Sequence, residues 1–313
     1  MPIALIYHDV VPDGAFDSSG FPGASAAHYK FSEAEFHRHL AALASLPTLL
    51  ASATHHRAPT GSGGAPTNIA NVSRSAFSAA GTLTEKLMDP VDFDGSAPCL
   101  LTFDDGGCSA YATVAGLLEA RGWRGHFFIT TDFLDQPGFL TSSEMRELHQ
   151  RGHVIGSHSC SHPARMSACT RTQLVDEWRR SCDVLAAITG EPVTTASVPG
   201  GFFSRRVAEA AAAAGIRTLF TSEPTAGTYL IDGCTVQGRY SVDRSVSIET
   251  VAAIAAGKIF PRLRQSALWQ IKKAAKTIAG PLYAEFRNRV LRRSLSSPAP
   301  TGHDHNSQWE VPS

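Results

Sequence analysis

Short apolar runs alternate with amphipathic segments over the first 221 residues. The runs predict buried strands at residues 3–7, 100–103, 126–130, 154–157, 195–198 and 218–221. Helices are predicted at residues 32–46, 109–121, 141–151, 170–188 and 204–214, where apolar side chains follow helical spacing. The first helix opens with Ser32 and Glu35 in a capping-box arrangement. Because strands that alternate with helices favour parallel pairing, we expect an α/β fold.

Three stretches fall outside this alternation. Residues 51–81 are rich in Ala, Ser, Thr, Gly and Pro and lack apolar periodicity, so we expect a surface insertion over 51–98. Residues 294–313 are rich in Ser and Pro, which is typical of a disordered tail. We therefore expect one folded domain over 1–257 and a basic helical extension over 258–293.

Polar side chains cluster directly after four of the predicted strands. In α/β folds the loops that follow the strands carry the chemistry, so these clusters predict one shared pocket. The clusters are His8-Asp9, Asp104-Asp105, His158 to His162, and Pro199-Gly200-Gly201.

Two of these clusters carry side chains that suit metal chemistry. Adjacent carboxylates such as Asp104 and Asp105 diverge, so one can bind a metal while the other serves as a base, although such pairs also occur in turns and helix caps. His158 and His162 are four residues apart and can reach one metal, or can be ordinary core histidines. A carboxylate with two histidines leaves positions for water and substrate, which is typical of a hydrolytic site. Cys160 lies between the histidines as a soft ligand or a core residue.

The combination of motifs resembles the polysaccharide deacetylases of carbohydrate esterase family 4. It consists of Thr-Phe-Asp-Asp-Gly, then His-Ser-x-x-x-His-Pro, then a strand that ends in x-Pro-Gly-Gly, and the opening Ile-Tyr-His-Asp-Val is similar to one branch of that family. The resemblance implies an irregular (β/α) barrel with about seven parallel strands, here followed by the basic helices. It also implies roles for site residues: Asp104 as general base, Asp105, His158 and His162 as ligands of zinc (or of cobalt or nickel), and the backbone N–H of Gly200 as an oxyanion donor.

The sequence departs from the family pattern in three places. The late Asp and Trp motif is not evident, and Tyr240-Ser-Val-Asp243 is the nearest acidic stretch. The arginine of the third motif, which orients the base, is replaced by Ser197, and Arg239 and Arg205 are candidates to replace it. The late histidine that acts as general acid is absent, because no histidine lies between His162 and His303. His8 is our candidate for that proton donor, or else a structural hydrogen-bond partner of the aspartates. His126 and His153 are expected to be structural.

Charge changes the picture only at the C-terminal end. Lys plus Arg and Asp plus Glu both number 28, which favours neither a nucleic-acid binder nor a highly acidic protein. Residues 258–293, however, hold ten basic residues and one acid. Apolar positions at helical spacing predict a helix over 261–279. It either caps the barrel and leaves a solvated basic face, or lies at a membrane surface against acidic lipid head groups.

Taken together, the residues and the resemblance predict a metal-dependent hydrolase. We expect it to remove N-acetyl groups from an amino-sugar polysaccharide or a lipid-linked oligosaccharide; the alternatives are a non-sugar amide or cyclic-imide hydrolase of the same fold and an inactive sugar-binding scaffold. The start Met-Pro-Ile-Ala-Leu lacks the features of a signal peptide, and the six cysteines form no CxxC pair. We therefore expect a cytoplasmic protein, peripheral at the inner face of the membrane, with a carbohydrate partner and no nucleic acid.

Overall fold

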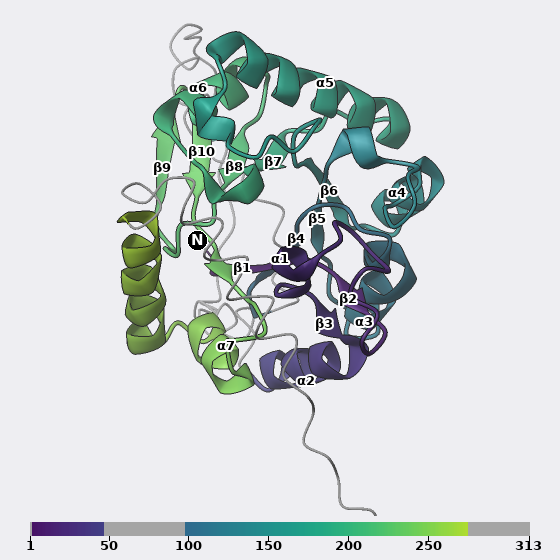
Figure 1. Cartoon of the computed structure of the whole chain (residues 1–313), viewed down its shortest axis with the longest axis vertical. Coiled ribbons are helices and arrows are strands. Elements are labelled where there is room, and N and C mark those ends of the chain that lie inside the picture. Colours follow the sequence, from purple (N-terminus) through teal and green to yellow (C-terminus); the bar gives the residue numbers. More distant parts are fainter. Residues whose placement is uncertain (1, 47–97, 275–313) are drawn as a thin grey trace, which may run out of the picture.

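A curled, mostly parallel sheet organises the part of the chain that the computed structural model describes, residues 2–46 and 98–274 (Figure 1). Its strands are β1 (Ala4–Tyr7), β4 (Leu100–Phe103), β5 (His126–Ile129), β6 (Val154–Ser157), β7 (Thr195–Ser197), β8 (Thr218–Phe220), β9 (Thr228–Ile231), β10 (Cys234–Gln237) and β11 (Tyr240–Ser241). Their order is β11-β1-β4-β5-β6-β7-β8-β10-β9, and only the β9–β10 pair is antiparallel. This arrangement confirms the expected α/β barrel-like fold, with more strands than the six that the apolar runs predicted.

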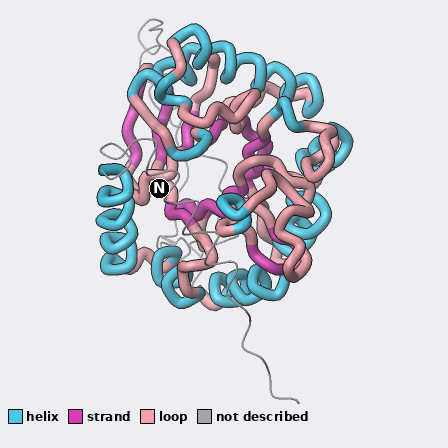
Figure 2. Tube along the Cα trace, viewed as in Figure 1, coloured by secondary structure: helices cyan, strands magenta, loops and turns pink. Residues whose placement is uncertain are grey.

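Helices surround the sheet on its outer side (Figure 2). Three of them begin at capping boxes, in which the N-cap hydroxyl accepts from the N3 backbone and the N3 side chain accepts in return. These caps confirm the predicted helix starts to within one residue. The helices with predicted counterparts are α2 (Glu33–Ala44), α3 (Ala115–Glu119), α4 (Ser142–Gln150), α5 (Arg171–Thr189) and α6 (Arg205–Ala213). Before α3, Ala110–Val114 forms a π-helical segment rather than the predicted α-helical turn.

Several short elements have no counterpart in the sequence prediction. They are β2 (Val10–Val11), β3 (Phe31–Ser32), α1 (Ala24–Ala27) and α7 (Ile248–Ala255), together with β9, β10 and β11. Most of them have two to four residues, which is too short for a periodic pattern to emerge. Of these elements, β9, β10 and β11 belong to the large sheet, whereas β2 and β3 pair with each other in a separate two-stranded sheet.

The apolar side chains of the strands pack on both sides of the sheet. Leu5 and Tyr7 face outward and are buried against α2, whereas Ala4 belongs to a smaller cluster with Leu100, Phe128 and Phe220. The rings of Phe128 and Phe220 lie 5.3 Å apart. This small cluster forms an apolar floor beneath the polar residues described below.

The sheet closes through the connection between β10 and β11. These strands lie toward opposite edges of the sheet, β10 next to β9 and β11 next to β1, yet only Gly238 and Arg239 separate them along the chain. The backbone N–H of Arg239 donates to the Glu223 carbonyl at 3.0 Å. A Cβ at Gly238 would lie 2.4 Å from that same carbonyl oxygen, so the close approach requires glycine.

The chain continues from α7 into a further helix, residues 259–274, which lies at the side of the molecule below β9 (Figure 1). Most of the predicted insertion over 51–98, the remainder of the extension to 293 and the predicted tail over 294–313 lie outside the described residues. Among the described residues, no helix has the length and apolar character needed to cross a membrane.

Candidate metal and catalytic site

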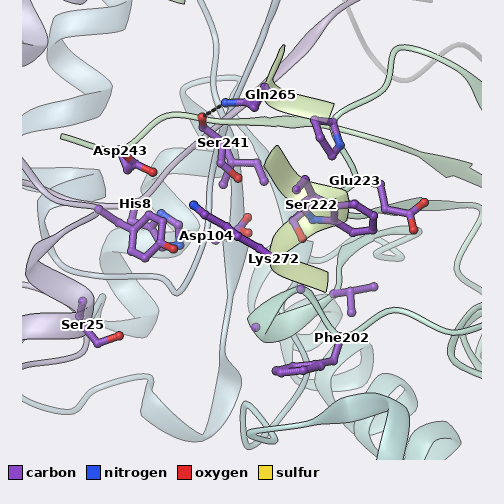
Figure 3. A pocket seen from close by; sticks show the side chains of 18 of the residues that line it. His8, Ser25, Asp104, Phe202, Ser222, Glu223, Ser241, Asp243, Gln265 and Lys272 are labelled. Atoms are coloured by element: carbon purple, nitrogen blue, oxygen red, sulfur yellow. Dashed lines mark hydrogen bonds between the residues drawn. The ribbon is translucent and has the colours of Figure 1, made fainter. Parts of the chain in front are cut away.

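The polar clusters that follow the strands do line one cavity, of about 1180 Å³. His8 follows β1, Asp104 and Asp105 follow β4, and His158 and His162 lie after β6. Figure 3 shows His8, Asp104 and Asp243 beside this cavity. The prediction of a shared pocket at the carboxyl ends of the strands is therefore confirmed.

Three side chains in the cavity wall form a group with the composition of a metal site. The Asp105 carboxylate lies 3.4 Å from His158 Nε2 and 3.5 Å from His162 Nε2. The potential ligand atoms of the three residues all lie within 4.8 Å of one another. The His158 ring is held from behind, because its Nδ1 lies 3.0 Å from the Ser197 carbonyl oxygen. Such a contact fixes the ring and directs the other nitrogen toward the site.

Unusual backbone conformations bring these ligands together. Asp105, with φ 77°, and Gly106, with φ 84°, turn the chain sharply at the end of β4. His162 is also left-handed, with φ 53°, and its N–H donates to the Ser159 hydroxyl. The His158–His162 loop is further held by Glu177 of α5, whose carboxylate accepts from the backbone N–H groups of the two residues before His162. The surrounding structure thus supports backbone strain at the residues that make the site.

Asp104 is held separately from this group, by a buried arginine. Arg239 donates to both carboxylate oxygens of Asp104, each at 2.8 Å, and the Ser197 hydroxyl donates to one of them at 3.1 Å. The guanidinium of Arg239 also lies over the rings of Phe128 and Phe220. The candidate Arg239 is therefore confirmed as the partner of Asp104. Arg205 is wrong for this role, since its side chain is exposed and pairs with a glutamate of its own helix.

The surroundings hold both carboxylates in their charged form. Burial would raise the pKa of Asp104, but the charge of Arg239, followed by that of His158, lowers it below its ordinary value. Burial likewise opposes ionisation of Asp105, and hydrogen bonds from His158 and His162 hold its pKa well below the usual range. For His162, burial acts downward but the Asp105 carboxylate raises the pKa overall.

Sequence comparison shows which known proteins are similar to this part of the chain. Residues 94–219, which include both aspartates and both histidines, match the sequence model described as polysaccharide deacetylase. This match covers less than half of the chain, and we use the term deacetylase domain for the described residues before helix 259–274, which contain it. Among curated proteins, PdaA of Bacillus subtilis, a peptidoglycan-N-acetylmuramic acid deacetylase, is 32% identical over 125 residues, which are 39% of this chain and 45% of PdaA. YxkH of the same organism is 29% identical over 167 residues, 52% of this chain and 57% of YxkH. The chain thus spans about half the length of these curated relatives.

Solved structures extend the likeness of the deacetylase domain to most of the described chain. The Streptococcus pyogenes deacetylase PplD, in complex with acetate, superposes with a TM-score of 0.55 at 14% identity, over 80% of this chain and 96% of PplD. IcaB from Ammonifex degensii gives a TM-score of 0.54 at 18% identity, over 81% of this chain and 96% of IcaB. At these identities the likeness shows a common fold.

Two further predicted residues of the deacetylase domain, His8 and Gly200, also line the cavity. The His8 ring packs on Tyr29, with centroids 5.1 Å apart. Its Nδ1 is buried and has no hydrogen-bond partner within residues 2–46 and 98–274. Gly200 adopts a left-handed conformation, with φ 62°, in the turn after β7.

His126, His153 and Cys160 behave as structural residues of the deacetylase domain. His153 accepts from the Gly125 backbone through Nδ1 and contacts Glu119 through Nε2 at 2.9 Å. His126 is buried at the start of β5, where its ring packs near Phe220. Cys160 is buried in the core and lies outside the metal-type group. These positions agree with the structural roles expected from the sequence.

Two stretches of the cavity wall were missed by sequence reasoning. Residues 21–30 pass over the site, and Lys30 is anchored there by bonds to three backbone carbonyls. Helix 259–274 forms the opposite wall. In the sequence, helix 259–274 was distinguished only by its basic composition. No pattern in residues 21–30 indicated that they line the cavity.

Proposed function

We propose that this chain is a metal-dependent hydrolase that removes N-acetyl groups from an amino-sugar polysaccharide or a lipid-linked oligosaccharide. The observation that carries the proposal is the different setting of two adjacent carboxylates. Asp105 lies against His158 and His162, whereas Asp104 is held by Arg239. This difference supports metal binding by Asp105 and proton acceptance by Asp104. The name of the relative PdaA supports an acetylated amino sugar as the substrate.

The residues present fit a divalent transition metal. One carboxylate and two imidazoles, with their ligand atoms within 4.8 Å, leave further positions for water and substrate. Asp105, His158 and His162 would hold the ion. We propose zinc, with cobalt or nickel as substitutes for the same nitrogen and oxygen donors. When bound, such an ion polarises a carbonyl group and lowers the pKa of water.

The other residues of the site supply proton transfer and orientation. Asp104 accepts a proton as water adds to the acetamide carbonyl, and the bidentate contact from Arg239 fixes the plane of its carboxylate. The Gly200 N–H donates to the oxyanion that forms, a contribution of roughly 3 kcal/mol. His8 delivers a proton to the nitrogen as the C–N bond breaks, which releases acetate and a free amine.

Acetate release and metal content, measured on the same protein sample, test this function. The substrates are N-acetylglucosamine oligomers, and the variants are Asp104→Asn and His158→Ala. We expect the wild type to bind zinc and release acetate. Asp104→Asn should keep the metal and lose release, and His158→Ala should lose both.

Other outcomes would redirect or refute the proposal. Bound zinc without acetate release from any amino-sugar oligomer would favour an amide or cyclic imide of another class. A metal-replete protein that binds no zinc would refute the catalytic role and favour a sugar-binding scaffold. The cytoplasmic location stays a prediction from the sequence.

A further inference from the structure

Helix 259–274 contacts the deacetylase domain through polar groups rather than through an apolar stripe. Arg262 Nε donates to the Tyr240 hydroxyl at 2.8 Å, and Gln265 Nε2 donates to the Ser241 carbonyl at 2.8 Å. These contacts agree with the alternative in which the helix caps the barrel, but its basic face is not wholly solvated, because Arg264 and Lys272 line the cavity. We call the side of the helix that contains Arg262 and Gln265 its docking face.

A second face of the helix lines the cavity and carries two cations. Arg264, Leu268 and Lys272 all lie in the cavity wall at four-residue spacing. Figure 3 shows the Lys272 side chain extending from the helix into the cavity. Eight residues of helix rise about 12 Å, so the two cations are spread along the wall. No acidic group of the described segments pairs with either side chain.

The acidic side chains of the cavity wall, in contrast, all have cationic or imidazole partners. These pairs are Asp104 with Arg239, Asp105 with His158 and His162, Glu223 with Lys273 at 3.7 Å, and Asp243 with His28 at 3.5 Å. The charges of this wall that remain without a partner in the described chain are therefore positive. Such a wall favours an anionic ligand.

The third face of the helix is apolar and turned to solvent. Ile259, Phe260, Leu263 and Ile271 are 63–79% exposed. The described chain has eight exposed large hydrophobic residues. Five of them lie on this helix: these four and Leu268 of the cavity face. Residues 258–274 also contain five basic residues and no acid. An apolar face flanked by basic side chains is complementary to an anionic lipid surface.

We propose that the substrate is an N-acetylated amino sugar joined through phosphate to a lipid, and that helix 259–274 recognises both parts. The outer apolar face enters the lipid surface, and Arg264 and Lys272 bind the phosphate in the cavity. This inference rests on the proposed deacetylase function and names its substrate class. The proposed roles of Arg264, Lys272 and the exposed apolar face do not involve any residue that takes part in the proposed hydrolysis.

Vesicle binding tests the lipid part independently of activity. Full-length protein is sedimented with phosphatidylcholine vesicles, with or without phosphatidylglycerol. We expect binding only to the anionic vesicles, with about fivefold stronger partitioning for each basic side chain near the surface. The Leu263→Glu variant should not bind the anionic vesicles, but it should still hydrolyse water-soluble N-acetylglucosamine oligomers. Val184→Glu, a matched change at an exposed apolar residue of α5, should bind as the wild type does.

A matched pair of substrates tests the phosphate part. One is N-acetylglucosamine linked to dodecanol through a phosphodiester, and the other is the dodecyl glycoside without phosphate. We expect kcat/KM to favour the phosphodiester about tenfold, the effect of one charge-assisted hydrogen bond. Arg264→Gln and Lys272→Gln should each reduce this preference. Arg179→Gln, which removes an exposed arginine of α5, should not.

Each contrary result has a distinct meaning. Equal rates on the two dodecyl substrates would overturn the phosphate assignment. An equal rate on soluble N-acetylglucosamine 1-phosphate would overturn the lipid assignment, as would a dimer that Leu263→Glu dissociates. If no acetylated sugar is hydrolysed at all, the proposed function itself fails, while the vesicle result still reports on the helix.

Discussion

Replacing Arg239 by methionine tests how the catalytic base is held. Arg239 is fully buried, and the five N–H donors of its guanidinium make five hydrogen bonds. Two of these go to Asp104. Methionine approximates the length of the side chain but removes every donor, so a buried carboxylate is left without its counter-charge. Breaking a buried pair in this way costs about 3–5 kcal/mol, a large share of a typical stability of roughly 5–15 kcal/mol.

The same change should separate proton transfer from metal binding. Without Arg239 the Asp104 carboxylate loses its fixed plane, and the pKa of Asp104 rises because its main charge partner is gone. General-base catalysis contributes about 10²–10⁴-fold, so we expect kcat to fall at least a hundredfold with little change in KM. Zinc content should not change, because Arg239 contacts Asp104 and not the proposed ligand Asp105, which lies against His158 and His162.

Two further variants make the Arg239 result interpretable. Arg205→Met removes an exposed arginine and should change neither kcat nor the melting temperature by much. Ser197→Arg combined with Arg239→Ser moves the guanidinium to the neighbouring side of the carboxylate, since the Ser197 hydroxyl already lies 3.1 Å from Asp104. We expect this double variant to recover part of the lost kcat. Full activity of Arg239→Met would refute the reasoning, because Ser197 alone would then suffice to hold the base.

Three other perturbations probe the metal group, a buried histidine and the closure of the sheet. His162→Ala should weaken zinc binding at least tenfold by equilibrium dialysis, whereas Asp104→Asn should keep the zinc. Burial lowers the pKa of His39 below 6.5, so stability is lost as pH falls through the pKa of the unfolded chain; His39→Gln should show a smaller drop in melting temperature between about pH 7.5 and 5.5. Equal drops in the two proteins would contradict this. Gly238→Ala places a Cβ 2.4 Å from a backbone carbonyl and should cost about 1–3 kcal/mol in urea denaturation; an unchanged midpoint would mean that the β10–β11 connection can shift.

The metal-type group could be predicted from the sequence because its residues directly follow strands. Once the alternation of strands and helices indicates parallel pairing, the residues after β4 and β6 must lie at the same end of the sheet. This argument brings Asp104, Asp105, His158 and His162 to one end of the sheet, whereas the choice of Asp105 rather than Asp104 as the ligand came from the resemblance to the family. The capping boxes were predictable for a similar reason, since both partners lie within four residues of each other.

The partner of Asp104 could only be narrowed to two candidates, because the contact spans 135 positions of sequence. No local sequence pattern predicts that the connection after β10, which contains Arg239, lies beside the end of β4, where Asp104 is. The faces of helix 259–274 could not be assigned from the sequence for a different reason. Periodicity shows which residues share a face, but not whether that face meets the protein, the cavity or the solvent. Leu263 and Ile271 are among the apolar positions at helical spacing, and both are exposed.

The closure of the sheet explains how a serine can stand where the family motif has an arginine. Positions 197 and 239 both adjoin the Asp104 carboxylate, one from β7 and the other from the β10–β11 connection. The site needs one guanidinium beside this carboxylate, and two would leave a buried cation without a partner. We therefore expect relatives of this fold to carry arginine at one of the two positions and a small or neutral residue at the other. An alignment in which many chains have arginine at both positions, or at neither while Asp104 is kept, would contradict this exchange.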